Sequence, residues 1–445
     1  MMPWQLSVAE MSRAIAERRL SPVDVLEAHL ARIEAVEPRV RAWVTIDRDG
    51  ARHAAQERDA EARANHLRGP LHGIPVGVKD IYHVAGLITT GGAGPFAHER
   101  AQRDATAVAR LRAAGAVILG KTTTTEFAFL DPTETGNPWN LAHTPGGSSS
   151  GSAAAVAARM VPLALGSQTV GSTVRPAGYC GIFGFKPTVG RIGCAGLLPL
   201  AWSFDSVGIF ARRSEDIRLT LGVLAGYDPE DLASVEAPPA DAPRGSRPPR
   251  LGVPRRFIAT AREDTVEHLE RVIDSVRRAG ADVKDIELPA SLAGLHEAGL
   301  LAVGVEAAAF HRERFAKHAV EYREKVRALL ATGMARPAAD YVAAIRHCRR
   351  FRRDLVGPVL AEVDALIMPV ASAPAPQGLT STGDPTFCAP WSFAGVPAIA
   401  VPTGRAADGL PLAVQLVGRP WDEDGLLGVA EWVDRVVGFD ETPNL

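Results

Sequence analysis

The chain has 445 residues, of which 46% are hydrophobic and 22% charged, a composition typical of a globular protein with a large core. Its 49 basic and 51 acidic residues give a formal charge of −2, so no broad electrostatic attraction to nucleic acid or an anionic membrane is indicated. No apolar run approaches the ~18 residues of a membrane span, and the polar N-terminus lacks the apolar core of a signal peptide. We therefore expect a cytoplasmic protein with a small-molecule or protein partner.

The four cysteines lie too far apart in the sequence to form a C-x-x-C pair or a regular framework; they are Cys180, Cys194, Cys348 and Cys388. This spacing predicts neither a zinc site nor a set of disulfides. We interpret them as buried thiols and expect no metal site.

Apolar residues at helical spacing occupy residues 1–65, which we expect to form helices that cover one face of a core. An apolar run from Ile74 to Val78, ending in Lys79, predicts a strand, and the helix that follows is expected to end at Gly115. The run from Ala116 to Leu119 predicts a second buried strand. Such a unit indicates an α/β fold, and we predict a large mixed, mostly parallel β-sheet covered by helices on both faces.

A second strand-helix-strand unit is predicted between Leu251 and Leu288. Before it, residues 236–249 contain five prolines, which is typical of an exposed, semi-rigid connection. After it, residues 297–363 have a helical, arginine-rich pattern, and residues 364–402 return to strand-like runs.

The residues from Gly115 to Thr122 match the phosphate-loop pattern GxxxxGK[ST]. A phosphate loop needs a strand before its first glycine and an exposed loop between its glycines. Here a helix is predicted before the motif and an apolar strand within it. Because backbone amides paired in a sheet cannot hold phosphate, we predict no nucleotide site.

A second motif, from Gly147 to Gly151, satisfies GxSxG and would make Ser149 the nucleophile of an α/β-hydrolase. The ten residues before it, NPWNLAHTPG, are polar and contain two prolines. They disfavour the central strand that this nucleophile requires, so we predict that Ser149 is not catalytic.

The stretch from Gly146 to Pro187 is rich in glycine and serine, yet it also contains apolar segments that a flexible linker would lack. Its succession of GGSSSGS, GSQTVGS, RPA and GFKPT resembles the amidase signature family, which also has a lysine in a G-[VI]-K-D context. The residues from Gly77 to Asp80 supply that lysine. NPWN at 137–140 and the segment at 409–420 extend the resemblance over nearly the full chain.

The resemblance implies the amidase-signature fold, with residues 1–445 forming a single domain. We divide it into the helical cover at 1–65, a signature core at 66–235, the connection at 236–249, and a C-terminal part at 250–445. The helical pattern at about 297–363 is then an insertion in that last part.

Carried over to this sequence, the resemblance implies a Ser-cisSer-Lys triad. Ser172 would be the nucleophile, Ser148 the bridging serine after a cis peptide bond, and Lys79 the base. A serine hydroxyl needs a neighbouring base to take its proton, and burial favours the neutral lysine that could do so. No cofactor is expected.

The loop around the nucleophile is expected to provide an oxyanion hole. Backbone N–H groups of Thr169, Val170, Gly171 and Ser172 would point at the carbonyl oxygen of the substrate as negative charge develops on it.

Three features depart from the pattern common in the family: Gln168 stands in place of Asp, Val170 in place of Gly, and Arg175 lies three positions after Ser172 rather than two. This variant resembles the branch of malonamidase and hydrolases of carboxylated ureas, in which an arginine so placed holds a substrate carboxylate. A guanidinium suits bidentate binding of a carboxylate. We therefore expect hydrolysis of a small linear amide that bears a carboxylate, through a serine acyl-enzyme. Pairing of Arg175 with an internal Asp or Glu is the alternative.

Other functions stay open. The glutaminase subunit of a tRNA-dependent amidotransferase shares this signature and would need a partner protein, although the three departures and the lack of a basic excess count against it. An allophanate or carboxybiuret type of urea hydrolase and a pure binding role are further alternatives. The resemblance is compatible with a homodimer, and direct contact with nucleic acid or membrane is not expected.

Overall fold

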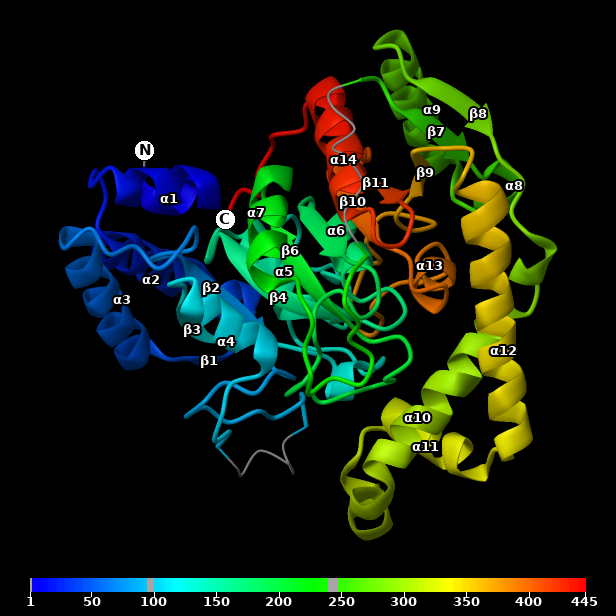
Figure 1. Ribbon diagram of the computed structural model, residues 1–445, viewed down its shortest axis with the longest axis horizontal. Coiled ribbons are helices and arrows are strands. Elements are labelled where there is room, and N and C mark those ends of the chain that lie inside the picture. Colours follow the sequence, from blue (N-terminus) through cyan, green and yellow to red (C-terminus); the bar gives the residue numbers. More distant parts are fainter. Residues whose placement is uncertain (1, 94–99, 239–246) are drawn as a thin grey trace.

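The computed structural model describes residues 2–93, 100–238 and 247–445, and an 11-stranded β-sheet runs through its centre (Figure 1). The strands lie in the order β1-β3-β2-β4-β6-β5-β10-β11-β9-β7-β8. Their bounds are β1 Trp43–Ile46, β2 Pro75–Lys79, β3 Val117–Thr122, β4 Leu163–Gln168, β5 Phe183–Lys186, β6 Ser206–Ala211, β7 Arg250–Val253, β8 Asp282–Asp285, β9 Ala365–Pro369, β10 Ala398–Arg405 and β11 Pro411–Val417.

The sheet is mixed, which confirms the predicted α/β fold. Four of its strand pairs are parallel and six are antiparallel, so the parallel share is smaller than predicted. Two of the parallel pairs, β2 with β3 and β7 with β8, belong to the two strand-helix-strand units that the sequence indicated. The antiparallel pairs include β10 and β11, which are joined by a short turn, and a short turn can connect only antiparallel strands.

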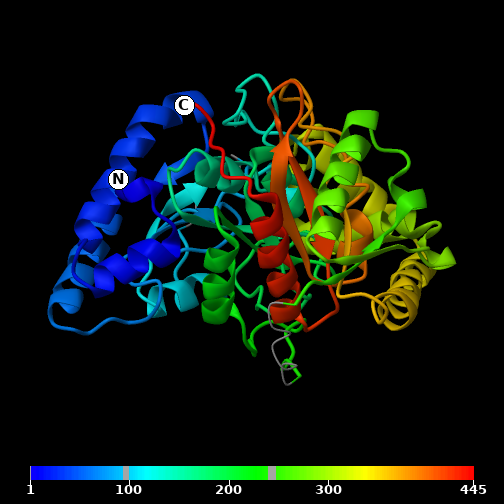
Figure 2. The ribbon, with the colours of Figure 1, turned by 90° about the horizontal axis from the view of Figure 1, so that it is seen from above.

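Helices cover both faces of the sheet, and the N-terminal helices and α10–α12 lie at its opposite ends (Figure 2). The helix bounds are α1 Val8–Ala16, α2 Pro22–Val40, α3 Arg48–Arg63, α4 Thr106–Ala113, α5 Ser150–Ala157, α6 Val174–Cys180, α7 Ser214–Leu224, α8 Arg255–Ile258, α9 Glu263–Arg278, α10 Leu295–His318, α11 Glu324–Ala335, α12 Ala338–Asp354, α13 Ala389–Phe393 and α14 Glu423–Val437.

The N-terminal segment contains the expected helices and one strand that the sequence did not predict. Strand β1 pairs antiparallel with β3 at the edge of the sheet. It follows α2 directly, where Arg41 adopts a left-handed conformation with φ of 56°. The Glu37 carboxylate then accepts hydrogen bonds at 2.9 Å from the backbone N–H groups of Ala42 and Trp43, which turns the chain into the strand.

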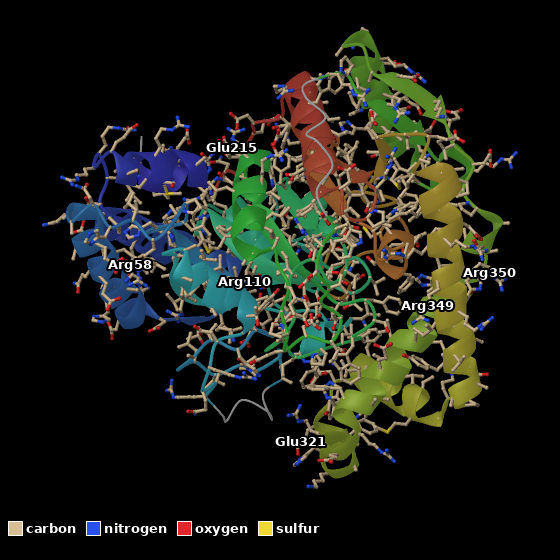
Figure 3. All side chains as sticks on the ribbon, in the orientation of Figure 1. Arg58, Arg110, Glu215, Glu321, Arg349 and Arg350 are labelled. Carbon is tan, nitrogen blue, oxygen red and sulfur yellow. The ribbon has the colours of Figure 1, made fainter. Side chains whose placement is uncertain are left out.

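The arginine-rich segment predicted at 297–363 forms α10, α11 and α12, and both α11 and α12 pack against α10. Arg349 and Arg350 of α12 are exposed (Figure 3). Across the described ranges, no helix combines the length and apolar character needed to cross a bilayer. Of the proline-rich connection at 236–249, residues 239–246 lie outside the described residues.

Small residues allow α5 to approach the sheet closely. All eight residues of this helix are buried. A Cβ atom at Gly151 would lie 2.2 Å from the carbonyl oxygen of Ala42, so a larger residue would collide with the backbone. Close packing therefore accounts for part of the small residues in the stretch that begins at Gly146.

Candidate active site

Lys79 is the last residue of β2, a buried strand between β3 and β4. The side chain of Lys79 is 0% exposed. Its Nζ donates hydrogen bonds of 2.7 Å to Ser148 Oγ and of 2.7 Å to Ser167 Oγ. The structure therefore brings together Lys79 and the predicted bridging serine, and adds a second hydroxyl that the sequence analysis did not include.

Burial lowers the pKa of Lys79 to about 7, because a charged ammonium loses its water shell inside the protein. The negative charge of Asp205 opposes this shift and raises the pKa in part. A substantial fraction of Lys79 is thus neutral near pH 7, as a proton acceptor must be.

Ser148 lies in a tight turn just before α5. The peptide bond between Gly147 and Ser148 is cis, as the family resemblance implies, and Gly146 has a φ of 84°. A Cβ atom at Gly146 would lie 2.9 Å from Pro176 Cα, so the turn packs directly against the start of α6. The Ser148 carbonyl oxygen accepts a hydrogen bond from the Thr125 backbone N–H at 3.2 Å, which holds the turn from its other side.

Ser172 lies in the loop between β4 and α6, and Gln168 holds this loop in place. Gln168 Oε1 accepts hydrogen bonds from the backbone N–H groups of Thr173 at 2.8 Å and Val174 at 2.9 Å. Its Nε2 donates to Ser392 Oγ at 2.9 Å, and Ser392 Oγ donates to the carbonyl oxygen of Val170 at 2.7 Å. The residue that departs from the family pattern thus joins both ends of the predicted nucleophile loop.

Asp205 supports the same loop from another direction. Its Oδ1 accepts a hydrogen bond from Thr169 Oγ1 at 2.5 Å, and its Oδ2 accepts from the backbone N–H groups of Leu200 at 2.9 Å and Ala201 at 3.1 Å. Burial raises the pKa of Asp205 to about 6, against the effect of these hydrogen bonds. Asp205 therefore both anchors the loop and raises the pKa of Lys79.

Ser172 is 8% exposed and lines a cavity of about 260 Å³. Within the described residues its hydroxyl makes no hydrogen bond, so the structure does not join it directly to Ser148. The loop from Thr169 to Ser172 and Arg175 form one wall of the cavity, and His296 and Leu300 of α10 with Lys325 of α11 contribute another. Among the described lining residues there is no Asp or Glu, so the cavity is suited to a negatively charged or neutral ligand.

Arg175, in the first turn of α6, is 2% exposed and reaches this cavity. Its Nη2 donates to the Gly147 carbonyl oxygen at 2.7 Å and to Thr382 Oγ1 at 3.2 Å. Its Nε and Nη1 are buried and lack a hydrogen-bond partner in the part of the chain that the structure describes. Burial lowers the pKa of Arg175, and within those residues no carboxylate forms an ion pair with it. The internal ion pair considered from the sequence is therefore not observed.

The two misleading glycine motifs have structural roles. Ser149 Oγ donates to the Ser167 carbonyl oxygen and accepts from the Ser167 backbone N–H, both at 3.2 Å, and in the described chain no strand leads into it. In the phosphate-loop match, strand β3 fills the motif and Lys121 forms a fully buried ion pair with Asp80 at 2.7 Å. The prediction that neither motif is a site of its usual kind agrees with this geometry.

Ser167 and Asp205 were not among the site residues predicted from the sequence, and the structural role of Gln168 was not predicted either. Ser167 and Gln168 are adjacent polar residues at the end of an otherwise apolar strand, and that interruption was the available signal. These polar residues can be assigned to the site only when β4 is known to lie next to β2, and the sequence does not reveal that pairing.

A family model described as Amidase matches residues 24–427. The chain belongs to the amidase family. The family, together with relatives named as amidases and as an amidotransferase subunit, indicates a hydrolase that acts on carbon–nitrogen bonds of amides. The matched range extends over β1 to β11 and contains every predicted site residue.

Known proteins are similar to this amidase over almost their whole length. The A-subunit of the glutamyl-tRNA(Gln) amidotransferase of Roseiflexus castenholzii is 38% identical, over 98% of this chain and 96% of that protein. A solved structure of a vestigial protein complex, described as revealing the origins of an s-triazine catabolic enzyme, has a TM-score of 0.91 and 29% identity, covering 98% and 100% of the two chains. The peptide amidase of Stenotrophomonas maltophilia has a TM-score of 0.85 and 29% identity, covering 98% of each chain.

Proposed function

We propose that this amidase hydrolyses the carbon–nitrogen bond of a small linear amide that carries a carboxylate. The observation that carries the proposal is Arg175, a buried guanidinium with two nitrogens that lack partners among the described residues, on the wall of the cavity that Ser172 also lines. An unpaired buried charge is costly, and a substrate carboxylate would supply the missing acceptors. The cavity of about 260 Å³ suits a small substrate.

The proposed reaction uses Ser172 as nucleophile, Ser148 as relay and neutral Lys79 as base. Ser172 Oγ attacks the amide carbonyl carbon as its proton passes to Ser148, whose own proton passes to Lys79 Nζ. The carbon–nitrogen bond then breaks, and the leaving amine takes the proton back along this path. Water attacks the resulting acyl-enzyme in the same manner, which releases the acid and restores Ser172. The hydrogen bond between Lys79 and Ser148 at 2.7 Å supports the relay.

The loop before the nucleophile supports an oxyanion hole. Among the described residues, the backbone N–H groups of Val170, Gly171 and Ser172 donate no hydrogen bond within the protein, although the loop itself is anchored by Gln168 and Asp205. Anchored donors without partners can bind an oxyanion without first breaking other hydrogen bonds, and losing one such donor costs ~3 to 4 kcal/mol. We assign the oxyanion hole to this loop, with Thr169 holding it through Asp205.

A glutaminase component of a tRNA-dependent amidotransferase is the second candidate. It is favoured by the 38% identity to the A-subunit of such an enzyme over 98% of this chain. Glutamine also carries a carboxylate, so the same Arg175 would serve both functions. The candidates differ in the partner: the glutaminase would act with a second protein, and the independent amidase would not need one.

Ammonia release from a matched substrate panel tests the proposal. The panel contains malonamate, a neutral amide of equal length, free glutamine, and a carboxylated urea. Turnover of malonamate or the carboxylated urea well above that of the neutral amide supports the main proposal. Preference for glutamine, together with co-purification of a partner protein, supports the glutaminase. Equal turnover of charged and neutral amides by the purified chain contradicts both.

A further inference from the structure

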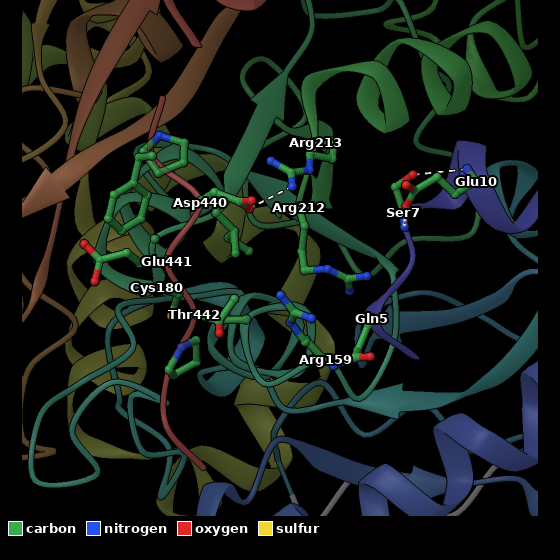
Figure 4. Close-up of a pocket in the computed structure, with 16 residues that line it drawn as sticks. Gln5, Ser7, Glu10, Arg159, Cys180, Arg212, Arg213, Asp440, Glu441 and Thr442 are labelled. Carbon is green, nitrogen blue, oxygen red and sulfur yellow. Dashed lines mark hydrogen bonds and ion pairs between the residues drawn. The ribbon is translucent and has the colours of Figure 1, made fainter. Parts of the chain in front are cut away.

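A second, smaller cavity of about 60 Å³ lies far from Ser172, where the N-terminal residues, the end of β6 and the C-terminal segment meet (Figure 4). Strands β4 and β6 are antiparallel, with Gln168 opposite Ser206 at one end and Leu163 opposite Ala211 at the other. Ser172 follows the first end and Arg212 the second. The two cavities are therefore at opposite ends of the same strands.

Three arginines, Arg159, Arg212 and Arg213, line this cavity together with three acidic residues. Each acidic residue is already engaged. Glu10 Oε2 accepts a hydrogen bond from the Ser7 backbone N–H at 2.7 Å. Asp440 pairs with Arg213 at 2.7 Å, and Glu441 pairs at 2.6 Å with Arg405, which does not line the cavity.

The remaining guanidinium groups, those of Arg159 and Arg212, face the cavity without an acidic partner among the described residues (Figure 4). Arg212 donates to the backbone carbonyls of Trp4, Leu6 and Val161. Arg159 Nε is buried and has no hydrogen-bond partner in the described ranges, and neither arginine forms an ion pair there.

The pKa shifts of the two side chains are consistent with a role in binding an anion. Burial lowers the pKa of Arg159, and burial together with the positive charge of Arg159 lowers the pKa of Arg212 to about 10. The charges of Asp440, Asp216 and Glu10 oppose these shifts through space, without an ion pair to either guanidinium in the described structure. Two neighbouring, partly buried cations of this kind are stabilised by an anion held between them.

We propose that this cavity binds one small oxyanion, with Arg159 and Arg212 as its charged ligands and inorganic phosphate as the simplest occupant. A water needs ~10 to 15 Å³ of such space, so a cavity of about 60 Å³ has room for one tetrahedral oxyanion. The bound anion connects the turn after α5, the end of β6 and the termini of the chain. The site is separate from the proposed reaction and does not depend on it.

Calorimetric titration of the full-length protein with sodium phosphate, with ionic strength held constant by sodium chloride, tests this site. The variants are Arg159→Gln and, as matched control, Arg175→Gln, which removes the buried cation of the other cavity. We expect one phosphate per chain for the unaltered protein and for Arg175→Gln, and binding at least ~10-fold weaker for Arg159→Gln. Absence of binding by the unaltered protein, or loss in Arg175→Gln with retention in Arg159→Gln, overturns the proposal.

Chemical modification gives a second readout that needs no variant. Phenylglyoxal reacts with accessible guanidinium groups, and peptide mapping reports the modification of each arginine. We expect phosphate, but not chloride, to slow modification of Arg159 at least ~10-fold, in line with charge-assisted binding. A parallel titration with glycerol phosphate distinguishes free phosphate from a phosphate monoester as the natural source. Unchanged modification of Arg159 in phosphate overturns the proposal.

Discussion

Arg175 donates a hydrogen bond of 2.7 Å to the carbonyl oxygen of Gly147, the residue that leads through a cis peptide bond into Ser148. The side chain that we propose for substrate binding therefore also touches the backbone of the proposed proton relay. Substrate binding and the position of Ser148 are consequently linked through one guanidinium.

Replacement of Arg175 by alanine should lower kcat/KM for carboxylate-bearing amides by ~100-fold or more, because two charge-assisted hydrogen bonds to the substrate are lost. Arg175→Lys keeps the positive charge but lacks the planar guanidinium group, so it should give an intermediate loss of kcat/KM. Steady-state kinetics on a matched neutral amide are the control. An equal loss on both substrates would mean that Arg175 only supports Gly147.

The activity should depend on pH through Lys79, which accepts a proton only when neutral. Its pKa of about 7 predicts that kcat/KM falls ~10-fold per pH unit below pH 7 and levels off above it. Asp205 raises this pKa, so Asp205→Asn should move the acid limb to lower pH. A pH–rate profile of both proteins measures the shift, and a limb that stays in place would argue against the coupling of Asp205 to Lys79.

Two serines, Ser172 and Ser149, could each be taken for the nucleophile from a sequence motif alone. Ser172→Ala should reduce kcat by at least ~10³-fold, since losing a nucleophile removes the covalent route. Ser149→Ala is the matched control, because its hydroxyl binds the backbone of Ser167, and its activity should stay within ~10-fold of the unaltered enzyme. Mass spectrometry after rapid quenching should detect an acyl group on the peptide that contains Ser172. An acyl group on Ser149 instead would reverse the assignment.

Gln168→Ala should lower kcat by ~10- to 100-fold with a smaller effect on KM, because the N–H groups of Thr173 and Val174 lose their acceptor at a cost of ~1 to 3 kcal/mol. Gln168→Glu keeps an acceptor oxygen for both groups and should recover part of the activity. If Gln168→Glu is no better than Gln168→Ala, the hydrogen bonds to the loop are not the reason for the loss.

The buried pair of Lys121 and Asp80 should matter for stability rather than for nucleotide binding. Lys121→Met leaves the Asp80 carboxylate without its ion pair in the core, which typically costs ~3 to 5 kcal/mol. Urea unfolding should show this loss, whereas the double variant with Asp80→Asn should regain part of it. ATP should not raise the unfolding midpoint of the unaltered protein, and a clear rise would revive the phosphate-loop interpretation.

Much of the candidate site could be predicted from the sequence because its residues lie in short motifs with defined spacing. Lys79 and Ser148 are 69 positions apart, yet they form the hydrogen bond that the resemblance implies. Ser167 could not be predicted, because its contact with Lys79 requires β2 and β4 to be neighbours. Asp205 reaches the loop from the position just before β6, by a side-chain direction that only the folded sheet determines.

Local patterns likewise predicted most of the fold, with informative exceptions. The helices at 1–65 and 297–363 were visible from their spacing, but β1 is only four residues long and carries no clear alternation. The share of antiparallel strand pairs was underestimated, because tertiary packing decides which strands pair. Strand β5, for example, lies between β6 and β10.

The cavity beside Ser172 is lined by several separate parts of the chain, two of which have different roles. The loop from Thr169 to Ser172 follows β4 of the central sheet, whereas His296, Leu300 and Lys325 come from the peripheral helices α10 and α11. Substitutions in α10 and α11 can therefore reshape the space for the substrate while Lys79 and Ser148 keep their surroundings. In evolutionary terms, such a division lets one catalytic core acquire new substrates through changes in a peripheral helical segment.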